Sequence, residues 1–72
     1  MSNVHSAAYQ NFIKRLRQAR IGAGLTQAVV ARALKRPQSF VSKIESGERR
    51  VDFIELKRLA KIYSKPLSYF EQ

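Results

Sequence analysis

The sequence predicts an all-α fold of five short helices in a single domain that spans residues 1–72. Apolar residues recur at the three- and four-residue spacing of a helix, and glycine, proline and capping residues separate the resulting segments. No segment alternates apolar and polar residues as a half-buried strand does. A chain of this length forms one small core.

The first helix is expected from about Ser6 to Ala23, and the N-terminus, about residues 1–7, is expected to be flexible. Its inner face consists of five residues at helical spacing: Tyr9, Phe12, Ile13, Leu16 and Ala19. Gly22 and Gly24 then supply stop signals.

A second and a third helix follow in close succession. Thr26 is a good N-cap for the second helix, whose inner residues are Val30, Ala31 and Leu34. Pro37 cannot occupy a helix interior, so the third helix begins at about Gln38. Gly47 supplies the left-handed residue that ends it, and Val41 and Ile44 face inward.

The fourth helix has the clearest start signal of the chain. Asp52 can cap its first turn while Glu55 reaches back, and Val51 can pack onto Leu56. This helix runs to about Tyr63. A short final helix then opens at residues 64–66 and carries Leu67, Tyr69 and Phe70.

Positive charge dominates the chain and is concentrated in its middle. The net charge is +9, and ten of the 14 basic residues lie between Lys14 and Arg50, where only Glu45 and Glu48 oppose them. Such a surface favours a polyanion, because binding to phosphates releases condensed counterions. From charge alone a nucleic acid is the expected partner, although small basic ribosomal, membrane-surface and RNA-binding proteins share this signal. The motifs described below favour double-stranded DNA, with a non-specific RNA or DNA binder as an alternative.

Several function classes are excluded by composition. Cysteine is absent, which rules out disulfides and thiolate zinc sites, and His5 is expected to be exposed to solvent without companions for a metal. The chain shows no nucleophile–base pair, paired carboxylates or glycine-rich phosphate loop, so we expect neither an enzyme nor a cofactor. It has no apolar run of roughly 20 residues and no signal peptide, which predicts a cytoplasmic protein without a membrane span.

The motifs together resemble the lambda-repressor/Cro-type helix-turn-helix family, also called the Xre family. The resemblance covers about Phe12 to Phe70 and rests on these residues: Leu16-Arg17, Arg20, Gly24-Leu25-Thr26-Gln27, Ala31, Leu34, Val41-Ser42-Lys43-Ile44-Glu45-Ser46-Gly47 and Leu59-Ala60. It implies a compact five-helix domain whose second and third helices form the helix-turn-helix. Such domains usually bind operator DNA as homodimers.

The third helix has the length and the polar residues to read bases. About nine residues give roughly 13 Å of helix, a length that can lie in the major groove at one point of contact. Its outward residues Gln38, Ser39 and Lys43 are the expected base contacts, together with Ser42. Phe40 lies beside them and could touch a thymine methyl, but we favour packing.

Other positions are expected to bind phosphates or to hold the fold. The resemblance implies that Gln27 contacts a phosphate and braces Gln38, and that Arg20 and Glu45 form a structural ion pair. Further phosphate-binding candidates, each with a plain solvated charge as the alternative, are Arg17, Lys35, Arg36, Arg49 and Arg50. Lys35 falls where this family's turn often has glycine, at a site expected to require positive φ.

The sequence thus predicts a transcriptional regulator, most simply a repressor that binds a palindromic operator as a homodimer. Ile62 and Leu67 are the candidate dimer contacts, whereas Tyr69 and Phe70 are expected to close the core. The alternative is an antitoxin-type regulator whose main partner is a protein, a toxin.

Overall fold

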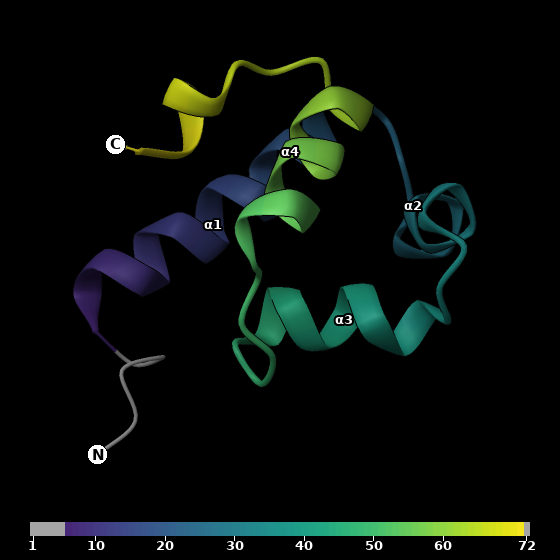
Figure 1. Cartoon of the computed structure of the whole chain (residues 1–72), viewed down its shortest axis with the longest axis horizontal. Helices are drawn as coiled ribbons and strands as arrows, with labels where there is room; N and C mark the ends of the chain where they lie inside the picture. The colour runs from purple at the N-terminus through teal and green to yellow at the C-terminus, as the bar shows by residue number, and fades with distance from the viewer. Residues whose placement is uncertain (1–5, 72) are drawn as a thin grey trace.

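The computed structural model describes residues 6–71, which form four α-helices followed by a 3₁₀ helix and include no strand (Figure 1). The elements are α1 (Ala7–Gly22), α2 (Gln27–Leu34), α3 (Gln38–Ser46), α4 (Phe53–Ile62) and η2 (Leu67–Glu71). The predicted all-α class is correct, but the fifth element is not an α-helix. Its five residues begin after Pro66, and the Tyr69 N–H donates to the Pro66 carbonyl at 3.0 Å. So short a segment favours the hydrogen bonds between residues three apart that define a 3₁₀ helix.

Side-chain caps fix the starts of three α-helices: Ser6 caps α1, Thr26 caps α2 as predicted, and Asp52 caps α4. The Ser6 hydroxyl accepts from the Tyr9 N–H at 3.2 Å, so α1 begins inside the segment that was expected to be flexible. Residues 1–5, including His5, lie outside the described residues. The predicted capping box of α4 is confirmed: Asp52 accepts from the Glu55 N–H at 2.7 Å, and Glu55 accepts from the Asp52 N–H at 3.1 Å.

Two residues in the left-handed conformation end α2 and α3. Lys35 follows α2 with φ 59°, as predicted for this turn, and Gly47 follows α3 with φ 87°. A Cβ on Gly47 would lie 3.3 Å from Ile13 Cδ1, so glycine suits this position in both conformation and space. These two turns set the directions of α3 and α4.

All five elements contribute to one hydrophobic core. The most fully buried side chains are Leu16 of α1, Val30 of α2, Val41 and Ile44 of α3, and Leu59 of α4. Phe70 of η2 is 4% exposed and meets Tyr69 edge-on at 5.0 Å between ring centroids, so η2 closes the core as expected. Within residues 6–71, no helix is long and apolar enough to cross a membrane.

The core holds α3 along one side of the molecule. α2 and α1 both pack against α3, and α4 rises from the end of α3 toward η2 (Figure 1). Val51 and Leu56, expected to pack together at the start of α4, are both partly buried against the core. This arrangement buries one face of α3 and leaves the opposite face in solvent.

We expect Lys35→Gly to leave the melting temperature unchanged or to raise it. A non-glycine residue at φ 59° costs about 1 kcal/mol, and relieving that cost in a domain of this size corresponds to roughly 4–8 °C. Lys35→Ala is the matched control, because it removes the charge and keeps the unfavourable φ. A clear drop in the melting temperature of Lys35→Gly, measured by circular dichroism, would contradict this account of the turn.

Candidate nucleic-acid interface

The solvent face of α3 carries the side chains predicted to read bases. Phe40, Val41 and Ile44 are buried on the inner face, and burial of Phe40 confirms the packing role that was favoured for it. On the outer face, Gln38, Ser39 and Lys43 are exposed and Ser42 is half-buried. The structure therefore presents all four candidate readers on one accessible surface.

Serine hydroxyls form a short row along this face. Ser42 Oγ donates to the Ser39 carbonyl at 3.2 Å, and Ser46 Oγ donates to the Lys43 carbonyl at 3.1 Å. The Ser46 hydroxyl also lies 3.2 Å from Glu48 Oε2, a second acceptor for its single hydrogen. The sequence prediction did not include Ser46, although the spacing of Ser39, Ser42 and Ser46 places them on one helical face.

A bidentate ion pair joins α1 to the end of α3. Arg20 Nε donates to Glu45 Oε2 at 2.7 Å and Arg20 Nη2 donates to Glu45 Oε1 at 3.0 Å, so the structure brings the predicted pair together. The third group, Nη1, donates to the Leu25 carbonyl at 2.9 Å. The two side chains are only 12% and 6% exposed, which makes this a largely desolvated contact.

Two side chains at this contact have shifted pKa values. The hydrogen bonds that Arg20 donates to the Glu45 carboxylate raise the pKa of Arg20, against the opposing effect of burial. Burial raises the pKa of the Tyr63 phenol to about 12, and the Glu45 carboxylate adds to this rise while Arg20 opposes it. Tyr63 is thus held neutral beside the pair.

Gln27 joins the same network from the first position of α2. Its Nε2 donates to Glu45 Oε1 at 3.0 Å, so the brace that was expected to reach Gln38 goes to Glu45 instead. The reason is geometric: Glu45 lies at the end of α3 that faces Arg20, and its carboxylate is the stronger acceptor. Gln27 therefore connects the start of α2 to the end of α3.

A shallow groove of about 260 Å³ lies beside this network. Its lining comes from α1, α2 and α3: Arg17, Arg20, Gln27, Ser42, Glu45 and Ser46. Arg17 is exposed there, unlike Arg20. The groove thus places one candidate phosphate-binding arginine next to the outer face of α3.

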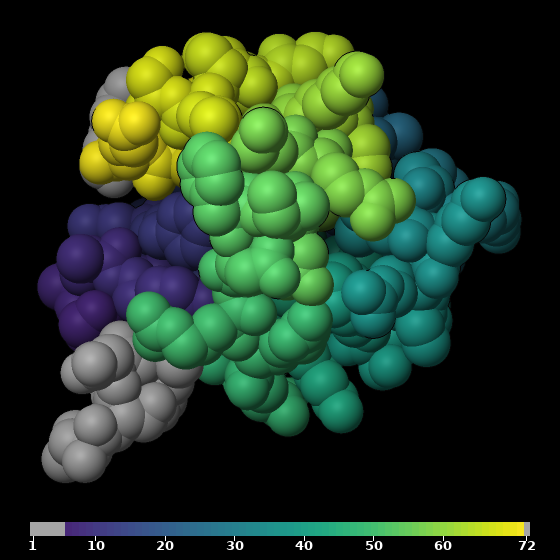
Figure 2. Space-filling model, in the orientation of Figure 1, coloured from purple at the N-terminus to yellow at the C-terminus, as the bar shows by residue number. Residues whose placement is uncertain are grey.

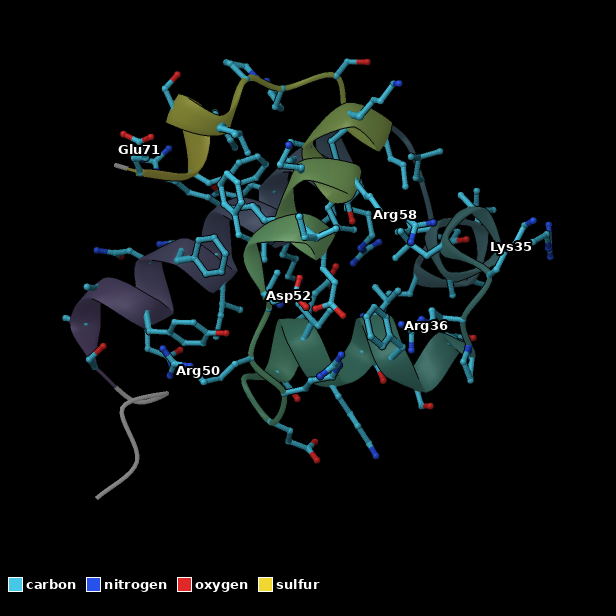
Figure 3. All side chains as sticks on the ribbon, in the orientation of Figure 1. Lys35, Arg36, Arg50, Asp52, Arg58 and Glu71 are labelled. Carbon is cyan, nitrogen blue, oxygen red and sulfur yellow. The ribbon has the colours of Figure 1, made fainter. Side chains whose placement is uncertain are left out.

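Three other arginine candidates are stacked on aromatic rings. The guanidinium carbons of Arg36 and Arg49 lie 4.8 and 4.6 Å from the Phe40 ring centroid, and that of Arg50 lies 4.4 Å from the Tyr9 ring centroid. Arg49 also pairs with Glu55 at 2.8 Å. Figure 3 shows Arg36 against α3, whereas Lys35 points outward from the turn. Stacking restricts these guanidinium groups while leaving their edges able to donate.

We expect Arg20→Ala to lower the free energy of unfolding by about 3 kcal/mol, because Glu45 would remain desolvated without its partner. Thermal or urea unfolding measures the change. Arg17→Ala on the exposed face of α1 is the control and should stay within about 0.5 kcal/mol of the wild type. The double variant Arg20→Ala/Glu45→Ala should lose less than the sum of the single variants. An unchanged melting temperature for Arg20→Ala would contradict the structural role.

We also expect stability to fall with rising pH because of Tyr63. Folding raises its pKa from 10.0 to about 12, so the stabilisation is present below pH 10 and is lost as the pH passes from 10 to 12. Tyr63→Phe cannot ionise and serves as the comparison. The wild type should lose more stability than Tyr63→Phe between pH 9 and 12 in urea unfolding; parallel curves would refute the assignment.

Comparison with known proteins identifies the family. The family model described as a helix-turn-helix domain matches residues 12–66. No curated protein and no solved structure gave a significant match. Helix-turn-helix domains are associated with DNA binding and are typically not enzymes. The resemblance predicted from the motifs is confirmed, and the chain belongs to the helix-turn-helix domain family of the Xre/Cro-like type.

Proposed function

We propose that this protein is a sequence-specific transcriptional repressor that reads an operator with α3. The observation that carries the proposal is the outer face of α3, where Gln38, Ser39 and Lys43 are exposed on a helix whose opposite face is fixed in the core. A helix held in this way can enter the major groove without rearrangement.

The candidate base-contacting residues of α3 differ in the base edges that they can bind. The amide of Gln38 can pair with N6 and N7 of adenine, and the ammonium of Lys43 can donate to O6 and N7 of guanine. Ser39 and Ser42 can pair with several bases and therefore add contacts with less discrimination. Gln38 and Lys43 are thus the principal specificity residues of the proposal.

Phosphate contacts would set the register of α3 in the groove. Gln27 and Arg17 lie on the α1 and α2 side of α3, and Arg36 and Arg49 flank Phe40. We propose these four, with Lys35 and Arg50, as the backbone contacts. Their positions around α3 support this assignment, because phosphates border the major groove on both sides.

We further propose that the protein binds a palindromic operator as a homodimer. A single domain of this size covers few base pairs, and two copies of α3 about 34 Å apart would read successive major grooves. Ile62 and Leu67 were the predicted dimer contacts, and both are partly buried against the core. Their role in a dimer stays a prediction.

Selection of bound duplexes from a random pool tests the proposed function. The wild type should enrich one palindromic motif, and Gln38→Ala and Lys43→Ala should each relax a different position of it, with a loss of about 1–3 kcal/mol at that base pair. Arg17→Ala is the control: it should weaken binding to all duplexes alike and reduce the salt slope by about 0.9. Equal binding of every duplex by the wild type would refute specific recognition.

A further inference from the structure

A groove between α2 and α4 combines an apolar floor with a positively charged rim. It has a volume of about 420 Å³ and is lined by Ala33 and Leu34 at the end of α2 and by Arg58, Lys61 and Ile62 of α4. Leu34 is only 5% exposed and Ile62 is partly buried against the core. Figure 2 shows α2 and α4 side by side on one face of the molecule. The groove is thus formed by the packing of two helices and not by a loop.

The two cations of the rim are not used by the fold. Arg58 and Lys61 are exposed and lie three residues apart, on one face of α4. Within residues 6–71, neither has a hydrogen bond, an ion pair or a ring contact, whereas Lys57 and Lys65 nearby each lie over an aromatic ring. Figure 3 shows Arg58 on the side of α4 that faces α2. Both cations are therefore available to a partner.

No acidic residue lines the groove. The five Asp and Glu residues of the chain are at positions 45, 48, 52, 55 and 71, outside α2 and outside residues 56–62 of α4. The acid that precedes this part of α4 is Glu55, and it pairs with Arg49 at 2.8 Å. An anionic partner would thus be attracted by the rim without a carboxylate in the groove to repel it.

The apolar floor favours a peptide over a nucleic acid. A phosphate backbone binds cations but brings no aliphatic side chain to Leu34 and Ile62, and unpaired bases stack on aromatic rings, which are absent from the lining. An amphipathic helix can place an apolar side chain in such a groove, with carboxylates beside Arg58 and Lys61. None of the lining residues is among the DNA contacts proposed above.

A second copy of the chain fits this groove poorly, although Ile62 is a candidate dimer contact. A two-fold contact centred on the groove would bring together Arg58 and Lys61 of both copies. These like charges would repel each other in a contact between two chains of net charge +9. The charge of the rim therefore favours an acidic partner of different sequence.

We propose that the α2–α4 groove binds an acidic amphipathic segment of another protein. One apolar side chain of the segment packs on Leu34 and Ile62, and its carboxylates pair with Arg58 and Lys61. Five lining residues are few beside the roughly 20–30 residues per side of a stable interface, so the contact is weak and reversible. This role adds a protein-binding surface and does not depend on the proposed reading of DNA by α3.

Fluorescence anisotropy with two labelled peptides tests the apolar part of the contact at about 0.15 M salt. The probe is an amphipathic helical peptide with leucines along one face and glutamates on both sides of them. In the comparison peptide, serines replace the leucines. The wild type should bind the leucine peptide saturably and the serine peptide about 10-fold more weakly. Equal binding of the two peptides, or no binding of the leucine peptide, would overturn the proposal.

Variants of the rim separate the groove from the overall positive charge of the chain. Arg58→Gln/Lys61→Gln should weaken binding of the leucine peptide about 10-fold. The matched control Lys57→Gln/Lys65→Gln removes the same charge from the same region and should change the affinity less than about twofold. Ala33→Glu places a carboxylate at an exposed position of the groove and should also weaken binding. Equal losses in the rim variant and the control would refute the site.

Two further measurements detect the competing occupants. If Arg58→Gln/Lys61→Gln weakens duplex DNA binding as strongly as peptide binding, the groove belongs to the DNA interface and the proposal fails. If the wild type sediments as a dimer that the leucine peptide dissociates, a second copy occupies the groove and the proposal also fails. We expect neither result. Equal binding of every duplex by the wild type would overturn the proposed function and leave the peptide contact standing.

Discussion

The contact between Arg20 and Glu45 is the interaction on which the rest of the structure depends. It connects α1 to the end of α3 through two hydrogen bonds, and the same arginine also donates to the Leu25 carbonyl before α2. Gln27 adds a bond from α2 to the same carboxylate. One desolvated ion pair thus fixes all three helices that surround the candidate interface. In a domain with so small a core, this link fixes the orientation of α3, which apolar packing alone would fix less firmly.

This arrangement separates the arginines that hold the fold from those that are available to DNA. Arg20 is committed to Glu45, whereas Arg17, one turn earlier on α1, is exposed beside the same groove. Arg36 and Arg49 occupy a middle position, because both stack on Phe40 and Arg49 also pairs with Glu55, while both keep some exposure to solvent. Stacking lowers the number of rotamers that each guanidinium samples before it meets a phosphate, which reduces the entropy lost on binding.

Much of the fold could be predicted from the sequence, because the residues that start and end its helices lie close together along the chain. The capping box of α4 needs only Asp52 and Glu55 at a fixed spacing. The left-handed turn at Lys35 was expected from the family resemblance, because the family's turn often has glycine at this position. The pairing of Arg20 with Glu45 spans 25 residues, and only the family resemblance indicated it.

The remaining features depend on three-dimensional packing. Gln27 binds Glu45 and not Gln38, which depends on the side-chain rotamers. Arg49 stacks on Phe40, which depends on the path of the loop after α3. The 3₁₀ form of η2 reflects a segment too short for a stable α-helical turn, which apolar spacing does not reveal. The exposure of Phe53 and Ile54 also lacked a sequence signal, since apolar residues in a helix are usually assigned to the core.

The most direct test of the central claim is a titration of isotopically labelled protein with the selected duplex, followed by NMR. The account predicts that amide signals of Gln38, Ser39 and Ser42 shift strongly, with the side-chain amide of Gln38 among them. Signals of Leu59 and Ala60 in the core of α4 should move little. Large shifts in η2 with none in α3 would contradict recognition through α3.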